Sequence, residues 1–171
     1  NPRMPDSISR LTDINLDDLV NSMGWRDSPR LAKLLRTLSR PAARKFARQM
    51  QKFDSQAGET DLATASRFML EMYVKDVRVY GLDRIPSNDP ILALSNHPGM
   101  TDTLCLFAAI NRPDLRIIAL DRPFLHSLPN VSRQLFFISD DSKERLSALR
   151  KAAAHLRGGG AVLTFPAGKI E

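Results

Sequence analysis

Residues 91–102 read Ile-Leu-Ala-Leu-Ser-Asn-His-Pro-Gly-Met-Thr-Asp, an apolar run that ends in a polar turn. The apolar part is typical of a buried strand. Pro98 favours the first position of a helix and disfavours helical geometry at His97. His97 is therefore expected just before a helix, with Asp102 in its second turn. Asp102 would hold one ring nitrogen of His97 and leave the other free to accept a proton, so the stretch predicts a general base.

A second apolar run, residues 161–164, opens into Phe165-Pro166-Ala167-Gly168-Lys169. Pro and Gly followed by a cation form a loop whose backbone can approach an anionic group closely. If both runs are strands of a parallel sheet, the two loops lie at its carboxyl edge, where open α/β sheets bind ligands. The sequence therefore predicts one site built from both loops.

The two loops together resemble the glycerolipid acyltransferase family, which includes 1-acylglycerol-3-phosphate and glycerol-3-phosphate acyltransferases. The first block of that family, Asn-His-x-x-x-x-Asp, is matched at Asn96, His97 and Asp102. The third block, Phe-Pro-x-Gly, is matched at Phe165, Pro166 and Gly168. The likeness covers about residues 75 to 171.

Two positions depart from the family pattern. Ala167 stands where the family usually has Glu, and the run 136–140 ends in an acid where an Arg usually contacts the acceptor phosphate. A cation for a phosphate-bearing acceptor would then come from Lys143, Arg145 or Lys169. The resemblance also implies further strands and a fourth block after Glu171, so the α/β domain is expected to be incomplete.

The resemblance implies acyl transfer from acyl-CoA or acyl carrier protein to a hydroxyl of a glycerolipid-like acceptor, a lysophospholipid or glycerol phosphate, in phospholipid biosynthesis. His97 would deprotonate the hydroxyl and Asp102 would stabilise the imidazolium, without a covalent enzyme intermediate. The acyl donor is a co-substrate, and no cofactor or metal is expected, because no ligand-type residues show metal-site spacing. Substrate contacts are expected from Asn96, Gly99, Phe165, Pro166, Gly168 and Lys169. Two other classes remain open: a non-catalytic lipid-surface binding module, and a hydrolase that uses the same His/Asp pair to activate water.

Positive charge is concentrated in residues 30–53, which hold eight Lys and Arg residues and no acid, while the whole chain carries +6. Leu and Phe recur at helical spacing opposite these cations, and Ser39 with Pro41 indicates a kink or a restart, hence two helices. A basic amphipathic helix is typical of a membrane-surface element. The alternative is that the apolar stripe packs on the catalytic domain. Membrane contacts are expected from Trp25, Arg36, Arg40, Arg44 and Arg48.

Other partners and compartments are constrained by composition. Nucleic acid is not expected, because the basic segment lacks aromatic interleaving and a nucleic-acid module. The single cysteine, Cys105, excludes an internal disulfide and is expected to be a small buried hydrophobe. No signal-like start and no 18-residue apolar stretch are visible, so a cytoplasmic protein, peripheral at the membrane surface, is expected. The chain begins at Asn1, which leaves a preceding segment or a removed anchor open.

The overall pattern predicts an α/β fold with a mostly parallel sheet covered by helices on both faces and an N-terminal helical extension. The expected domains are a basic helical extension, 1–58, and an acyltransferase-like α/β domain, 59–171. In the extension we expect an irregular arm over 1–12, a short helix over 15–23 and a linker over 54–58. Strands are expected at 76–80, 91–95, 115–120, 135–139 and 161–165. Helices are expected from a Thr60 cap to about Tyr73, over 99–110, and over 142–157 behind an Asp141 cap.

Overall fold

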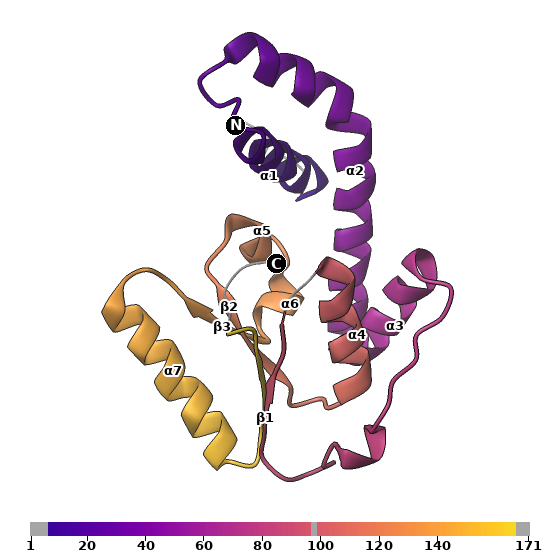
Figure 1. The fold of residues 1–171 in the computed structure, drawn as a ribbon, viewed down its shortest axis with the longest axis vertical. Coiled ribbons are helices and arrows are strands. Elements are labelled where there is room, and N and C mark those ends of the chain that lie inside the picture. The colour runs from indigo at the N-terminus through magenta and orange to yellow at the C-terminus, as the bar shows by residue number, and fades with distance from the viewer. Residues whose placement is uncertain (1–6, 97–98, 167–171) are drawn as a thin grey trace. The chain divides into compact units, whose positions relative to one another are not determined.

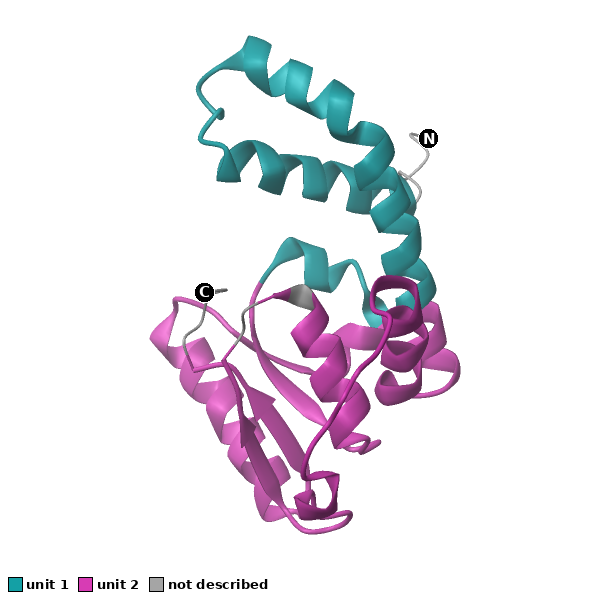
Figure 2. Ribbon diagram, turned by 45° about the vertical axis from the view of Figure 1, so that its right-hand side comes forward, with its two compact units in different colours: residues 1–54, 122–129 teal, residues 55–121, 130–171 magenta. Residues whose placement is uncertain are grey.

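The computed structural model describes residues 7–96 and 99–166 of the chain (Figure 1). It divides into two compact units, coloured separately in Figure 2. Unit 1 is formed by residues 1–54 and 122–129, and unit 2 by residues 55–121 and 130–171. The expected domain boundary at residue 58 stays a prediction.

Unit 1 is helical. It contains α1 (Ser7–Ser22), most of α2 (Pro29–Glu59) and the short α5 (Pro123–His126). Leu11 and Leu16 of α1 are almost fully buried, and α1 contacts α5. Phe46 of α2 stacks on Phe124 of α5 with ring centroids 6.0 Å apart. These aromatic and aliphatic contacts form the apolar interior of the unit.

Two expectations for this extension are wrong. Residues 7–12, expected to be an irregular arm, form the first turns of α1, because Leu11 continues the helical spacing of Leu16 and Val20 on its buried face. The expected pair of helices and the linker over 54–58 are one helix of 31 residues, α2. Pro41 lies inside it and cannot donate a backbone hydrogen bond, and Figure 1 shows the helix bent, as proline-containing helices are.

Unit 2 holds a parallel sheet, as predicted. In the described part of the chain its strands are β1 (Ile91–Leu94), β2 (Arg116–Leu120), β3 (Leu135–Ile138) and β4 (Ala161–Thr164). Their order is β1-β4-β2-β3, and every pairing is parallel. α4 (Met100–Ile110) follows β1, α6 (Pro129–Ser132) precedes β3, and α7 (Ser142–Arg157) connects β3 to β4. The α/β prediction is confirmed.

Helices cover the two faces of this sheet unequally. α4 and the adjoining α3 (Leu62–Tyr73) lie on one side, and α7 lies on the other, against β2, β3 and β4 (Figure 1). The side chains of β4 from Ala161 to Leu163 are fully buried. Cover is less complete on β1, where Leu92 and Leu94 are 52% and 65% exposed.

The strand expected at 76–80 is absent, since residues 74–80 are irregular. Val77 and Val79 alternate as a strand requires, yet no described strand lies beside them to complete the backbone hydrogen bonds. The segment ends at Gly81, whose positive φ of 79° favours glycine, and continues into a short 3-10 turn, η1 (Leu82–Arg84).

Helix ends follow local side-chain chemistry. The Asp141 carboxylate accepts hydrogen bonds from the backbone N–H groups of Lys143 and Glu144, which confirms the predicted cap of α7. The cap of α3 is Asp61 and not Thr60, because the Asp61 carboxylate accepts the Thr64 N–H at 2.9 Å.

Candidate functional site

The two loops singled out in the sequence leave neighbouring strands of the sheet. Leu94 at the end of β1 pairs with Thr164 at the end of β4, and the Ser95 N–H donates to the Thr164 carbonyl at 3.2 Å. Both loops therefore start side by side at the carboxyl edge, as predicted from the parallel arrangement. Asn96 is exposed here and Phe165 is half-buried, so both are available at this edge.

Several predicted site residues lie outside the described residues. These are His97, Gly168 and Lys169, together with Pro98 and Ala167. The expected contact between His97 and Asp102 and the expected roles of Gly168 and Lys169 stay predictions. Pro166, the last described residue of its loop, is exposed.

Asp102 lies at the start of α4, where the chain arrives from His97. It occupies the first turn of the helix, earlier than the second turn expected. Its Oδ2 is so close to Gly99 that a Cβ on residue 99 would stand 3.3 Å away. The carboxylate thus folds back over the helix start, where the N–H groups and the helix dipole favour negative charge. This arrangement presents a carboxylate, half-buried but still accessible, to the loop that carries His97.

Cys105, expected to be a small buried hydrophobe, lies one turn after Asp102 on α4 and is half-buried. Burial and the charge of Asp102 both raise the pKa of its thiol. A raised pKa keeps the thiol protonated near neutral pH, whereas a nucleophilic cysteine needs the thiolate. The site chemistry therefore does not point to a cysteine nucleophile.

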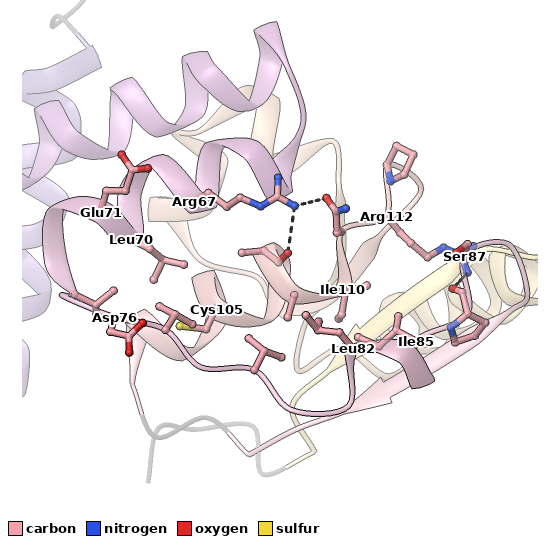
Figure 3. Close-up of a pocket in the computed structure, with 18 of the residues that line it drawn as sticks. Arg67, Leu70, Glu71, Asp76, Leu82, Ile85, Ser87, Cys105, Ile110 and Arg112 are labelled. Carbon is pink, nitrogen blue, oxygen red and sulfur yellow. Dashed lines mark hydrogen bonds between the residues drawn. The ribbon is translucent and has the colours of Figure 1, made fainter.

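A groove of about 780 Å³ begins at Cys105 and runs beside α4. It lies between α3, α4 and the irregular segment that precedes β1 (Figure 3). Cys105 and Asp76 lie at one end in this view, and Ser87 and Arg112 lie at the other. The lining is mostly apolar and includes Leu70, Val77, Val79, Leu82, Ile85 and Ile110. Sequence reasoning missed the groove because it assigned residues 76–80 to an edge strand.

Arg112 lies at the far end of this groove, and its role was not predicted from the sequence. It is 7% exposed, and its guanidinium forms an ion pair with Asp114 at 2.6 Å. It also donates to the carbonyls of Pro86 at 3.2 Å, of Gly159 at 2.8 Å and of Asp89. The hydrogen bond from Arg112 holds the pKa of Asp114 below its usual value. In the sequence, the signal that could have indicated this ion pair is Arg-x-Asp directly after the end of a helix.

Two of the cations considered for contact with an acceptor phosphate, Lys143 and Arg145, lie near the end of β3. Arg145 donates to the Asp140 carbonyl at 2.9 Å, which puts its guanidinium at the carboxyl end of β3. Lys143 is exposed on the first turn of α7. β3 is separated from β1 by β4 and β2, roughly 14 Å at the usual strand spacing. Arg145 is therefore at the same edge of the sheet as the two loops but distant from Asp102.

The residues expected to contact a membrane differ in their ion pairs and in their exposure. Arg36 and Arg40 pair with Asp17 and Asp13 of α1 at 2.5 and 3.5 Å. Trp25 is half-buried, whereas Arg44 and Arg48 are exposed. In residues 7–96 and 99–166, no helix is both long enough and apolar enough to cross a bilayer. The same described ranges contain no group of three or more His, Cys, Asp or Glu residues suited to a metal ion.

Comparison with known proteins adds one positive finding. The family model described as Acyltransferase matches residues 76–171, more than half of the chain. The matched segment contains both loops, the groove-lining residues of α4 and the whole sheet. No curated protein and no solved structure matches the chain.

Proposed function

Because this chain belongs to the Acyltransferase family, we propose that it moves a fatty acyl group from a thioester donor to a hydroxyl of a glycerolipid-like acceptor. The donor is acyl-CoA or acyl carrier protein, and the acceptor is a lysophospholipid or glycerol phosphate. The observation that carries the proposal is the Asp102 carboxylate held over the start of α4, at the edge where both loops leave the sheet.

In the proposed reaction His97 is the general base. It accepts the hydroxyl proton while the acceptor oxygen attacks the thioester carbon, and Asp102 stabilises the imidazolium that forms. The tetrahedral intermediate collapses to the ester, and the thiolate leaves and takes up the proton from His97. Backbone N–H groups near Gly99 or Gly168 would hold the developing oxyanion. The half-buried, accessible carboxylate of Asp102 supports this arrangement.

We assign the acyl chain to the groove along α4. Its mostly apolar lining suits a hydrocarbon, and its volume lies within the range of small-molecule sites. The end at Cys105 is one helical turn from Asp102, so a chain lying in the groove would have its thioester end toward the proposed base.

The experiment that tests the proposed function measures the release of free CoA from a long-chain acyl-CoA, with and without acceptor. Release that depends on glycerol 3-phosphate or a lysophospholipid supports acyl transfer. Equal release without acceptor would identify a hydrolase instead, because water would be the acceptor. If no free CoA is released from acyl-CoA, and no free acyl carrier protein from its acylated form, with any of these acceptors, a lipid-binding module is left as the function.

A further inference from the structure

A row of leucines on the first part of α2 is open to solvent. Leu31, Leu34 and Leu38 are 43%, 54% and 71% exposed. At the regular helical rotation they fall within an arc of about 60°, so they form one continuous row. Single exposed leucines are ordinary, whereas several in a row mark a contact surface. Met23, in the connection that precedes α2, is 51% exposed as well.

The apolar stripe of α2 is divided into two parts with different environments. In the later part Ala47, Met50 and Phe53 are at most 5% exposed, and Phe46 stacks on Phe124. The later part therefore packs inside the protein, and the first part does not. Of the two alternatives that the sequence left open, packing describes the later half of the helix, and the first half stays open to an outside contact.

Cations border the leucine row. Arg30 adjoins it on the helix surface, and Lys45, seven residues after Leu38, continues the same row. Exposed Arg48 extends the positive charge along the same side, whereas Lys33 and Arg44 lie nearer to Arg40 by helical rotation. α2 has no acid before Asp54. Arg36 and Arg40 are directed to the acids of α1 by their ion pairs, so they hold α1 and α2 together. The leucine row is complementary to the hydrocarbon layer of a membrane, and the cations beside it are complementary to anionic lipid headgroups.

We propose that residues 29–48 dock on the surface of an anionic lipid bilayer. Leu31, Leu34 and Leu38 enter the boundary between headgroups and acyl chains, while Arg30, Lys45 and Arg48 bind lipid phosphates. Nucleic acid shares the attraction to cations but gains nothing from three exposed leucines, so the leucine row favours a bilayer. The surface lies outside the matched segment 76–171, and the proposal does not depend on acyl transfer.

The first test uses vesicle co-sedimentation with phosphatidylglycerol–phosphatidylcholine mixtures and with pure phosphatidylcholine. The parent protein is expected to bind the anionic vesicles at least about tenfold more tightly than the neutral ones, and salt should weaken this binding steeply. Equal binding to both vesicles would overturn the proposal. Tighter binding to an RNA homopolymer than to anionic vesicles would overturn it in favour of nucleic acid.

Leucine variants test the apolar part. Leu34→Ser with Leu38→Ser is expected to lower anionic-vesicle binding by about tenfold or more, because two half-exposed leucines no longer enter lipid. The matched control is Leu146→Ser with Leu149→Ser on α7, where the leucines are 48% and 45% exposed. The control should bind like the parent. Equal loss in both pairs, or no loss in the first, would overturn the role of the row.

Charge variants test the electrostatic part. Replacing Arg30, Lys45 and Arg48 by Gln should reduce binding by about tenfold or more at moderate salt. The control removes the same charge from exposed α7 positions, with Arg150, Lys151 and Arg157 replaced by Gln. Equal weakening by both sets would show that only net charge acts and would contradict a defined docking surface.

A measurement on the parent protein needs no substitution. Trp25 is the only tryptophan and lies just before α2. Its fluorescence is expected to be quenched by brominated phosphatidylcholine when phosphatidylglycerol is present, because docking brings residue 25 to the interface. Unchanged fluorescence with vesicles that co-sediment the protein would contradict docking through this end of α2.

Discussion

The carboxylate of Asp102 lies against Gly99, so close that a Cβ on residue 99 would stand 3.3 Å from Oδ2. Gly99 has an extended φ of −172°, which any residue adopts, so a side chain here would be limited by the space that Asp102 occupies and not by the backbone. Gly99 precedes α4 as its N-cap residue and follows the loop that carries His97. A side chain at residue 99 would therefore act on the proposed catalytic pair through the position of Asp102.

Gly99→Ala is expected to lower the acyl-transfer rate by about tenfold, because the new Cβ displaces the Asp102 carboxylate by a few tenths of an ångström. Alanine is also a poor N-cap, so the melting temperature should fall modestly. Gly99→Ser is the matched variant, since it has the same Cβ but adds a capping oxygen. It should recover the melting temperature while remaining slow. Parent-like turnover in both variants would show that the position of Asp102 does not limit the rate.

Occupancy of the groove can be followed at Cys105, the only cysteine of the chain. Its raised pKa makes alkylation slow at neutral pH, so the reaction with iodoacetamide is best followed at alkaline pH. A non-reactive long-chain thioether analogue of acyl-CoA should slow the reaction by about fivefold or more, because a bound chain covers most of its site. CoA without the chain should not. Equal rates with and without the analogue, in protein shown to bind it, would exclude the groove as the acyl site.

The ion pair between Arg112 and Asp114 predicts a pH dependence of stability. Because Arg112 lowers the pKa of Asp114, the pair stabilises the fold above about pH 4, the unfolded carboxyl pKa, and this stabilisation is lost as pH falls through the lower folded value. Asp114→Asn should cost on the order of 2 kcal/mol at pH 7, less than a fully buried pair, since the Asp114 side chain is 36% exposed. The difference should shrink toward zero in strong acid.

The control for this prediction is Asp76→Asn. Asp76 pairs with Arg78 at the same sequence separation, but the two side chains are 64% and 77% exposed. Its loss should change stability by about 0.5 kcal/mol or less. Urea unfolding of the parent and both variants at several pH values measures these differences. If the loss of unfolding free energy caused by Asp114→Asn is constant from pH 7 to pH 2, the proposed link between the Asp114 pKa and stability is contradicted.

The α/β fold was predictable where its signals are local. Each run at 91–95, 115–120, 135–139 and 161–165 is apolar and bounded by turn residues, and each became a strand. Asp141 capped α7 as expected, because its partners lie within the next turn. The run 76–80 failed despite its alternating valines, since a strand needs a neighbour that the local sequence does not specify.

The candidate site was predictable to the level of its loops. Parallel strands place both loop starts at one edge, and the Ser95–Thr164 hydrogen bond confirms this. The closeness of Asp102 to Gly99 and the groove beside α4 depend on side-chain direction and on the path of an irregular segment. Arg112 acts on carbonyls up to 47 residues away, so a local pattern could not reveal its role.

His97, supported by Asp102, is the proposed general base of acyl transfer. The most direct measurement is the acceptor-dependent turnover of long-chain acyl-CoA by the parent, by His97→Ala and by His126→Ala, an exposed histidine of α5, with melting curves for all three. His97→Ala is predicted to lose about 100-fold or more of the turnover at unchanged melting temperature, because general-base catalysis contributes on that order, while His126→Ala keeps the parent rate. Near-parent turnover in folded His97→Ala would contradict the claim and place the base elsewhere.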